Sequence, residues 1–249
     1  RERRGRSPIA TVAGGDVAAG GVGASGSAPR FERQVTADAV ATDVEAPVLG
    51  TVDCAYERLG LPVLSEEQHM ALRSGELVQS QDRSGHTGRG YAVVELDVPK
   101  HFVVDILASF EEYERMIPVV RNSQVVSTFN CEEGLEHAHC QYKLSKFGIG
   151  VFAKHQVDRT TGTIKFEVAR ENFSFILREA AGHWHVEDLG GGRSRVWFSV
   201  DVEASSFVPH SMVDYAAERA LKRATSWLKP YAEEMWRLEL DNVGCAAMA

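Results

Sequence analysis

The chain has 249 residues, a formal net charge of −8 at pH 7 and 44% hydrophobic residues, which are the values of an ordinary globular protein. This acidic balance argues against a generic nucleic-acid binder, because a negatively charged protein is repelled by the phosphate backbone. No apolar run reaches the roughly 18 residues that a membrane-spanning helix needs, so we expect no transmembrane segment. Four cysteines without a CxxC motif are too sparse for a disulfide-stapled secreted scaffold and indicate free thiols.

The first 36 residues differ in composition from the rest of the chain. Residues 1–30 hold seven Gly, six Ala and three Ser, and no aromatic residue precedes Phe31. Residues 1–36 carry a net charge of +3, which leaves −11 for the remainder. We expect residues 1–36 to be disordered, since they offer little apolar surface to bury. The composition fits either a plastid or mitochondrial transit segment or the plain tail of a cytoplasmic protein.

We interpret residues 37–74 as a linker with short helices, because proline and glycine interrupt its helical stretches. One helix start in this segment is well marked. Ser65 and Gln68 have the spacing of a capping box, in which each side chain bonds the backbone of the other residue. We expect this helix to run to about Arg73 and to end at Gly75.

Residues 75–240 form the predicted main domain, followed by a C-terminal tail over 241–249. A strand pair is expected first, then a helical segment over 99–118 that ends at Pro118. Period-two alternation of apolar and polar residues follows, which predicts consecutive antiparallel strands with one buried and one wet face. In the last strand, for example, Val196 and Phe198 face inward and Trp197 faces outward. The expected strands lie at about 76–81, 90–98, 123–129, 137–144, 150–158, 163–170, 174–188 and 194–204.

The last predicted element is a long helix from about Pro209 to Leu240. Apolar residues recur at steps of three and four along it, which places them on one face. Pro230 lies inside this pattern, so we expect a kink near residues 226–230. A long helix across a curved antiparallel sheet is an α+β two-layer design.

Three blocks of this domain carry a family resemblance. They read SFEEYERMIPVVRNSQVV, GHWHVEDLGGGRSRVWFSVDVEA and VPHSMVDYAAERALKRATSWLKPYAEE. In their order and spacing, they resemble the polyketide cyclase/dehydrase or coenzyme Q-binding branch of the START-like (SRPBCC) superfamily. The resemblance covers about residues 75–236. It implies a helix-grip fold, in which the sheet wraps around the C-terminal helix and leaves an apolar cavity between them.

The cavity is predicted from the family resemblance, because the sequence pattern alone does not distinguish a cavity from a solid core. Dense packing by itself favours a solid core, in which the alanines of the last helix let it approach the sheet closely. The resemblance instead favours a cavity with Tyr113, Met116 and Ile117 at its mouth. Its walls are then formed by Phe166, Trp184, Phe198, Ala217, Leu221 and Ala224, with Tyr142 and His155 as polar candidates.

The histidines give no metal site in this prediction. Two HxH pairs, His137 with His139 and His183 with His185, lie on strands that two other strands separate, so a shared zinc site is not expected. His155 shares its face with apolar residues and is expected to point inward, as either a satisfied core residue or an acid/base group.

Two function classes remain, and neither needs a cofactor. The first is a binder or carrier of a hydrophobic small molecule (a quinone, a lipid or a polyketide-like compound) with peripheral membrane contact at the cavity mouth. The second is a polyketide cyclase or dehydratase that uses the same cavity, with His155, Tyr142 or Arg170 as polar groups. A scaffold domain with a filled core is a third option. Apolar walls discriminate weakly between similar hydrocarbons, so the sequence leaves the ligand's identity open.

Overall fold

The computed structural model describes residues 56–131, 134–144, 149–168, 177–208, 219 and 221–246. The expected targeting segment, residues 37–55 of the linker, Arg170 and Ala217 lie outside these described residues.

Eight antiparallel strands form one sheet in the order β1-β2-β8-β7-β6-β5-β4-β3. The order brings the N-terminal hairpin beside the last strand, while β3 to β8 follow one another as a meander. All eight predicted strands are present, most of them within a few residues of the predicted bounds. The bounds are Val78–Ser84 for β1, Thr87–Leu96 for β2, Val120–Cys131 for β3, Leu135–Leu144 for β4, Ile149–Asp158 for β5, Thr163–Val168 for β6, Leu177–Gly190 for β7 and Arg193–Ala204 for β8.

The predicted helical segment over 99–118 is divided into three short elements. Helix α3 covers Lys100–Ala108, a 3-10 turn η1 covers Phe110–Glu112, and helix α4 covers Tyr113–Met116. The break lies at Ser109, whose backbone (φ −81°, ψ 64°) is not helical. The predicted helical segment thus contains a break that its sequence pattern did not indicate, and Phe110 and Tyr113 after the break are both buried.

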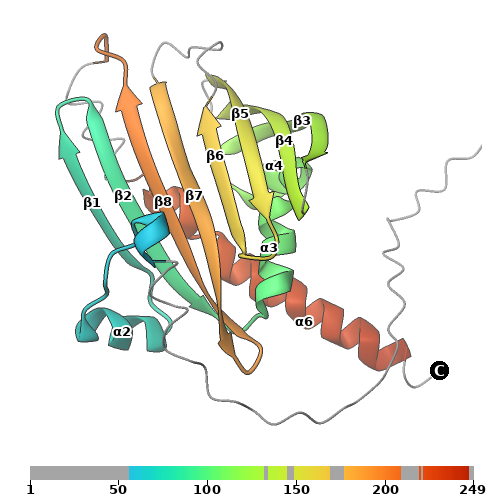
Figure 1. Ribbon diagram of the computed structural model, residues 1–249. Helices are drawn as coiled ribbons and strands as arrows, with labels where there is room; N and C mark the ends of the chain where they lie inside the picture. The colour runs from blue at the N-terminus through green and yellow to red at the C-terminus, as the bar shows by residue number, and fades with distance from the viewer. Residues whose placement is uncertain are drawn as a thin grey trace, which may run out of the picture. The chain divides into compact units, whose positions relative to one another are not determined.

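Helix α6 covers Leu228–Ala246, and the chain before it is helical over 221–225. The two helical stretches are separated by a turn at Ser226 and Trp227, which confirms the predicted kink. Pro230 falls in the first turn of α6, where its missing N–H costs no helix hydrogen bond. In Figure 1, α6 and α3 lie on the same side of the sheet.

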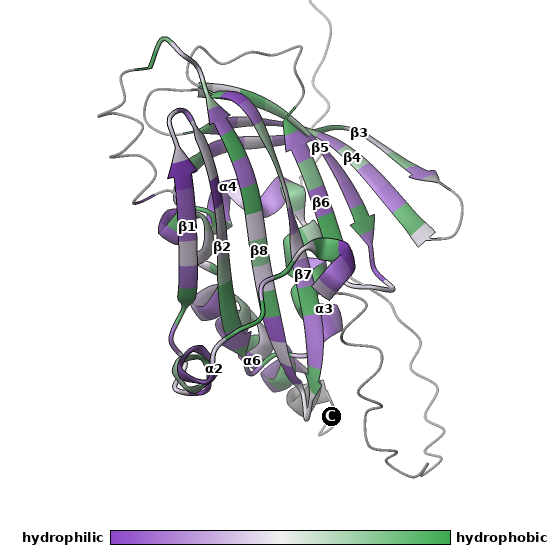
Figure 2. Ribbon diagram, turned by 60° about the vertical axis from the view of Figure 1, so that its left-hand side comes forward, coloured by the Kyte–Doolittle hydropathy of each residue, from purple (hydrophilic) through white to green (hydrophobic). Residues whose placement is uncertain are grey.

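The inner face of the sheet and these helices enclose the main hydrophobic core. Alternate strand residues such as Val196 and Phe198 on β8 point into it, and the colours of Figure 2 alternate accordingly along the strands. The curved antiparallel sheet with its C-terminal helix confirms the predicted α+β helix-grip fold.

The outer face of β1, β2 and β8 carries a second core. Trp197, which the alternation places on the solvent side, does face outward, but none of its surface is exposed. It is covered by residues 56–64 and by helix α2 (Glu66–Arg73), which lie on the side of the sheet opposite to α6 (Figure 1). The capping box of Ser65 and Gln68 starts α2 as predicted. The expectation of a wet outer face was therefore wrong for this part of the sheet.

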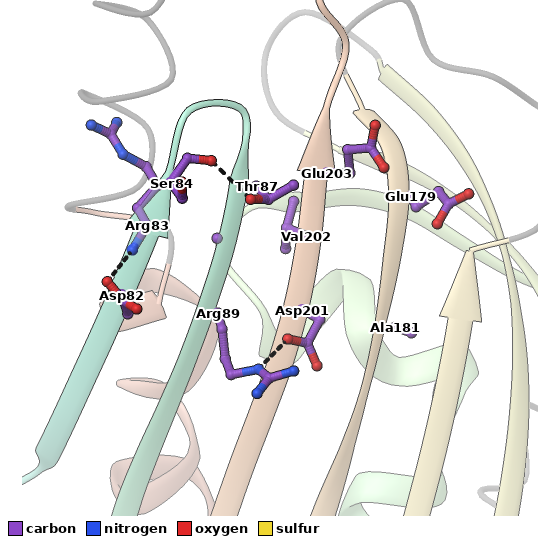
Figure 3. Close-up of a pocket in the computed structure, with 11 residues that line it drawn as sticks. Asp82, Arg83, Ser84, Thr87, Arg89, Glu179, Ala181, Asp201, Val202 and Glu203 are labelled. Carbon is purple, nitrogen blue, oxygen red and sulfur yellow. Dashed lines mark hydrogen bonds and ion pairs between the residues drawn. The ribbon is translucent and has the colours of Figure 1, made fainter.

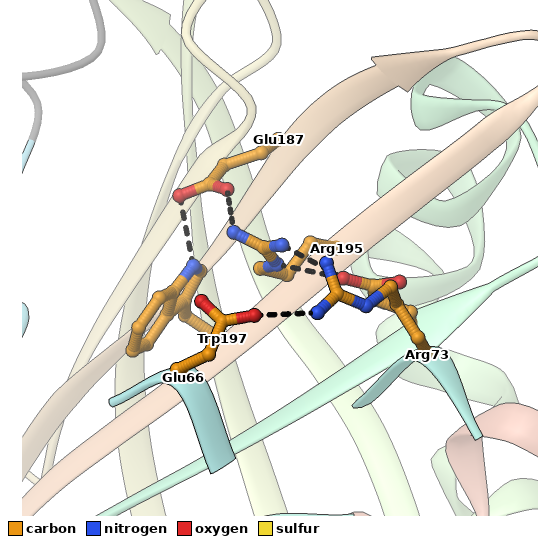
Figure 4. Close-up of polar contacts among 6 residues, drawn as sticks. Glu66, Arg73, Glu187, Arg195 and Trp197 are labelled. Atoms are coloured by element: carbon orange, nitrogen blue, oxygen red, sulfur yellow. Dashed lines mark hydrogen bonds and ion pairs between the residues drawn. The ribbon is translucent and has the colours of Figure 1, made fainter. Parts of the chain in front are cut away.

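A mostly buried ion cluster accompanies this second core. Arg195 lies between two carboxylates, 2.7 Å from Glu95 and 3.6 Å from Glu187. Glu187 also accepts a hydrogen bond of 2.8 Å from the indole of Trp197, as Figure 4 shows. Burial, followed by the charge of Glu187, raises the pKa of Tyr56 to about 12. The segment N-terminal to β1 is thus joined to the sheet by polar as well as apolar contacts.

Candidate functional site

The structure brings the described residues of the predicted cavity together on the inner face. They come from α4 and the residue after it, from β4 to β8 and from the helical stretch before α6. All ten belong to the main core or pack against it: Tyr113, Met116, Ile117, Tyr142, His155, Phe166, Trp184, Phe198, Leu221 and Ala224.

Seven aromatic side chains in this region contact one another in a closed loop, which we call the aromatic circuit. Neighbouring ring centroids are 4.4 to 6.5 Å apart, within the range of favourable aromatic pairs. Trp227 closes the loop from the helix side. It belongs to the apolar stripe of the predicted last helix, but it was not among the predicted cavity residues. In order around the loop, the members are Tyr113, Tyr142, His155, Phe166, Phe198, Trp184 and Trp227.

The two halves of the core differ in how completely they are closed. Leu107, Val186 and Leu228, near α3 and the start of α6, have no accessible surface. The buried members of the aromatic circuit, by contrast, each keep 6 or 7% of their surface accessible. A water-sized molecule therefore reaches part of each of these rings but does not reach Leu107, Val186 or Leu228.

One buried polar pair belongs to the circuit. The hydroxyl of Tyr142 and Nε2 of His155 are joined by a hydrogen bond of 2.9 Å. Cys140, two residues before Tyr142 on β4, is a free and fully buried cysteine. The parity of β5 predicted that His155 points inward, and the structure confirms this position. Its ring stacks on Phe110 at a centroid distance of 4.2 Å.

Burial keeps this pair uncharged. It lowers the pKa of His155 to about 3, so that the imidazole is neutral at physiological pH. Burial also raises the pKa of Tyr142, which keeps the phenol protonated, and the neighbouring Tyr113 raises it further.

The second ring nitrogen of His155 has no hydrogen-bond partner. Nδ1 is buried, and no protein atom satisfies it. If the Tyr142 hydroxyl donates to Nε2, Nδ1 carries a proton with no acceptor. If Nε2 carries the proton instead, Nδ1 is an unused acceptor. In both tautomers one buried hydrogen-bonding group is left open, which is rare in packed interiors.

The two HxH pairs point to the outer face and stay apart. His137 and His139 lie on β4, His183 and His185 on β7, and β5 and β6 run between them. Thr163 hydrogen-bonds Nδ1 of His185 at 3.0 Å. In the part of the chain that the structure describes, no three His, Cys, Asp or Glu side chains gather as a metal site would require.

No helix among the described residues is both long and apolar enough to cross a bilayer. The peripheral membrane contact expected from the sequence stays a prediction.

No protein-family model and no curated protein matches the chain significantly. Solved structures of START-like proteins are similar to it. The Zhui aromatase/cyclase from Streptomyces sp. R1128 is 12% identical with a TM-score of 0.48, over 64% of this chain and 94% of that chain. A START superfamily protein from Mycobacterium smegmatis is 15% identical with a TM-score of 0.47, over 64% and 98%. The STAR-related lipid transfer protein from Xanthomonas axonopodis is 11% identical with a TM-score of 0.46, over 63% and 98%. These similarities concern the fold.

Proposed function

We propose that the domain binds a hydrophobic small molecule between the sheet and the C-terminal helix and carries it without chemical change. The observation that supports this most directly is the aromatic circuit, whose buried rings each keep some accessible surface while Leu107, Val186 and Leu228 have none. Ligand sites of this kind are mostly apolar with one or two polar groups that fix orientation. Aromatic faces would contact a flat or branched apolar molecule on several sides.

The open nitrogen of His155 would supply the polar contact. A ligand hydroxyl would satisfy Nδ1 in either tautomer, because it both donates and accepts, and a ligand carbonyl would satisfy Nδ1 in the tautomer in which Nδ1 carries the proton. A quinone, a fatty acid or a polyketide-like compound each carries such an oxygen. The proposed ligand is therefore an apolar molecule with at least one oxygen function.

The charge state of the polar pair favours binding over catalysis. An efficient general base has a pKa near the working pH, and a histidine with a pKa of about 3 is a weak base at neutral pH. The raised pKa of Tyr142 likewise disfavours its ionisation. Both groups are thus suited to hydrogen bonding with a ligand rather than to moving protons.

A cyclase or dehydratase is the second candidate, and one contact favours it. Tyr142 and His155 are two polar groups at a common point of an apolar interior, which is the minimum that an aldol closure would use. Turnover of a polyketide-like substrate that is lost in both Tyr142→Phe and His155→Leu would favour this candidate over the carrier.

Ligand uptake can be tested with the purified full chain. Native mass spectrometry with solvent extraction would identify an apolar molecule that copurifies. For the emptied protein, titration with decylubiquinone or oleate is expected to change the tryptophan fluorescence saturably, because Trp184 and Trp227 belong to the circuit. Repeated recovery of bare protein that binds neither probe would overturn the carrier proposal.

Two alanine substitutions separate a cavity from a solid core. Ala224 packs at the edge of the accessible region, and Ala232 is fully buried in the closed half. If the space exists, Ala224→Leu is expected to keep the stability within about 0.5 kcal/mol and to weaken probe binding. Ala232→Leu is expected to cost about 1 to 3 kcal/mol, because it overpacks a closed core. Equal losses of stability in both variants would indicate a filled core.

A further inference from the structure

We propose that a groove on the outer face of the sheet is a second binding site, for a small organic anion that joins a phosphate or carboxylate to an aromatic or apolar group. This outer groove has a volume of about 810 Å³, within the range of small-molecule sites. It lies between the turn at Arg58, Leu59 and Gly60 and the outer faces of β4 to β8. The proposal does not depend on a ligand at the inner face.

The strand register places a row of five polar side chains across this groove, and none of the five is a carboxylate. His137 pairs with Gln156, Gln156 with Lys165, Lys165 with His183, and His183 with Ser199. All five residues line the groove. Each of these side chains can donate a hydrogen bond, the histidines at a ring nitrogen that carries a proton, so the row matches an oxygen-rich anion.

The carboxylates of the neighbouring row are already occupied by cations. Glu167 lies 3.6 Å from the ammonium of Lys154, and Asp201 lies 2.5 Å from the guanidinium of Arg89. Among the described residues, no carboxylate lies within ion-pair distance of Lys165. The groove therefore has one ammonium group without an ion-pair partner among the described residues, in a body that is acidic as a whole.

His183 adds an open hydrogen-bonding atom beside this ammonium. Its Nε2 is buried and has no hydrogen-bond partner. Burial, followed by the nearby charge of Lys165, lowers the pKa of His183, and the charge of Asp201 opposes this shift. An anion between them would neutralise Lys165 and accept a hydrogen bond from a protonated Nε2.

The ends of the groove offer apolar contacts for the rest of such a ligand. The ring of Phe129 is stacked on His137 at 5.0 Å with nearly parallel planes, and it remains 44% exposed. Leu59, from the segment that precedes β1, also lines the groove. A flat ring attached to the anionic group would find stacking or apolar surface there.

A neighbouring hollow on the same face has the opposite charge character, which marks the limit of the site. It has a volume of about 480 Å³ and is lined by four carboxylates, Asp82, Glu179, Asp201 and Glu203. In Figure 3, the side chain of Arg89 is directed at Asp201, and both residues line the hollow as well as the outer groove. An anion is therefore expected at the Lys165 row and not in this hollow.

The test uses the full chain with three probes and one matched pair of variants. Phenyl phosphate and benzoate are expected to bind saturably in calorimetry, and benzyl alcohol about tenfold more weakly or not at all, because it lacks the charge. Lys165→Gln is expected to weaken anion binding about tenfold or more. Lys143→Gln removes the same charge from an exposed site on the outer face of β4 that does not line the groove, and it is expected to change binding less than about twofold.

Three results would overturn the proposal. They are the absence of saturable binding by both anions, equal weakening by Lys165→Gln and Lys143→Gln, and equal binding of the alcohol and the anions. Equal thermal unfolding midpoints of the two variants would confirm that a difference in binding is not a difference in folding. The tighter of the two anions would identify the head group as phosphate or carboxylate.

Discussion

Tyr142 and His155 are hydrogen-bonded inside the core, on the adjacent strands β4 and β5. Neither residue is directly opposite the other, since Tyr142 pairs with Val151 and His155 with Ala138. The hydrogen bond therefore joins two side chains that lie diagonally on neighbouring strands, on the inner face of the sheet. It is a polar contact within a loop of aromatic rings.

Removal of the Tyr142 hydroxyl is expected to destabilise the fold. Tyr142→Phe keeps the ring but leaves Nε2 of His155 without a partner, in addition to the already open Nδ1. A buried group deprived of its partner costs about 1 to 3 kcal/mol of unfolding free energy. Urea unfolding measures the loss. Tyr231→Phe is the control, because Tyr231 is partly exposed, and a similar loss there would contradict the role given to the hydrogen bond.

The stability of the domain is expected to fall as the pH falls from about 6.5 towards 3. The native pKa of His155 is about 3, below its ordinary value of 6.5, so the unfolded chain binds a proton in this range that the native state does not bind. The contribution of His155 is full above pH 6.5 and decreases by up to about 1.4 kcal/mol for each pH unit below it. Burial lowers the pKa of His185 to about 4, which acts in the same direction.

His155→Leu isolates this effect. The variant is expected to flatten the dependence of the unfolding free energy on pH between 4.5 and 6.5, measured by urea unfolding at several pH values. Phe166→Leu changes the packing of the same face without a titratable group, and it is expected to shift the whole curve while keeping its slope. An unchanged slope in His155→Leu would mean that His155 is not buried as a neutral group.

The ion cluster beneath the N-terminal segment provides a third prediction. The side chains of Arg195, Glu95 and Glu187 are only 14%, 12% and 15% exposed. Arg195→Met would leave two mostly buried carboxylates without their cation, which is expected to cost about 2 to 4 kcal/mol. Arg115→Met breaks an ion pair with Glu112 whose side chains are 80% and 45% exposed, and it is expected to cost less than about 0.5 kcal/mol. Equal costs in thermal unfolding would contradict the burial of the cluster.

Local sequence patterns predicted the strands well, but they did not predict which segments of the chain cover the outer face of the sheet. Alternation places Val196 and Trp197 on opposite faces because successive strand side chains point to opposite sides. It does not show that Trp197 is covered by Tyr56, which is 141 positions earlier in the chain and contacts it edge to face at 5.4 Å. The outer core was missed because its partners are distant in sequence.

At the inner site, too, the sequence pattern predicted which way a strand residue points but not which residues it contacts. The parity of β5 is sufficient to point His155 inward, since the neighbouring residues on that face are apolar. The hydrogen bond to Tyr142 and the place of Trp227 in the circuit depend on how strands and helix pack, which spacing along the chain does not encode. Ser109 likewise has no breaker sequence, yet it interrupts the predicted helix because the chain turns there to bury Phe110.

Gly182 on β7 allows the closest approach of the sheet to one ring of the circuit. A Cβ atom at this position would lie 2.7 Å from Cζ of Phe166 and would collide with the backbone oxygen of Ser199. Gly182→Ala is therefore expected to cost about 1 to 3 kcal/mol, because backbone on β8 and the ring on β6 would both have to move. Gly150→Ala is the matched control, since a Cβ atom on Gly150 would meet nothing within 4 Å.

The effect of Gly182→Ala on ligand uptake separates packing from binding. Because Phe166 belongs to the aromatic circuit, its displacement is expected to weaken decylubiquinone binding in Gly182→Ala even at a temperature where the variant is fully folded. Gly150→Ala is expected to bind as the unmodified chain does. Destabilisation of Gly182→Ala with unchanged probe affinity would show that the probe does not contact this part of the inner face.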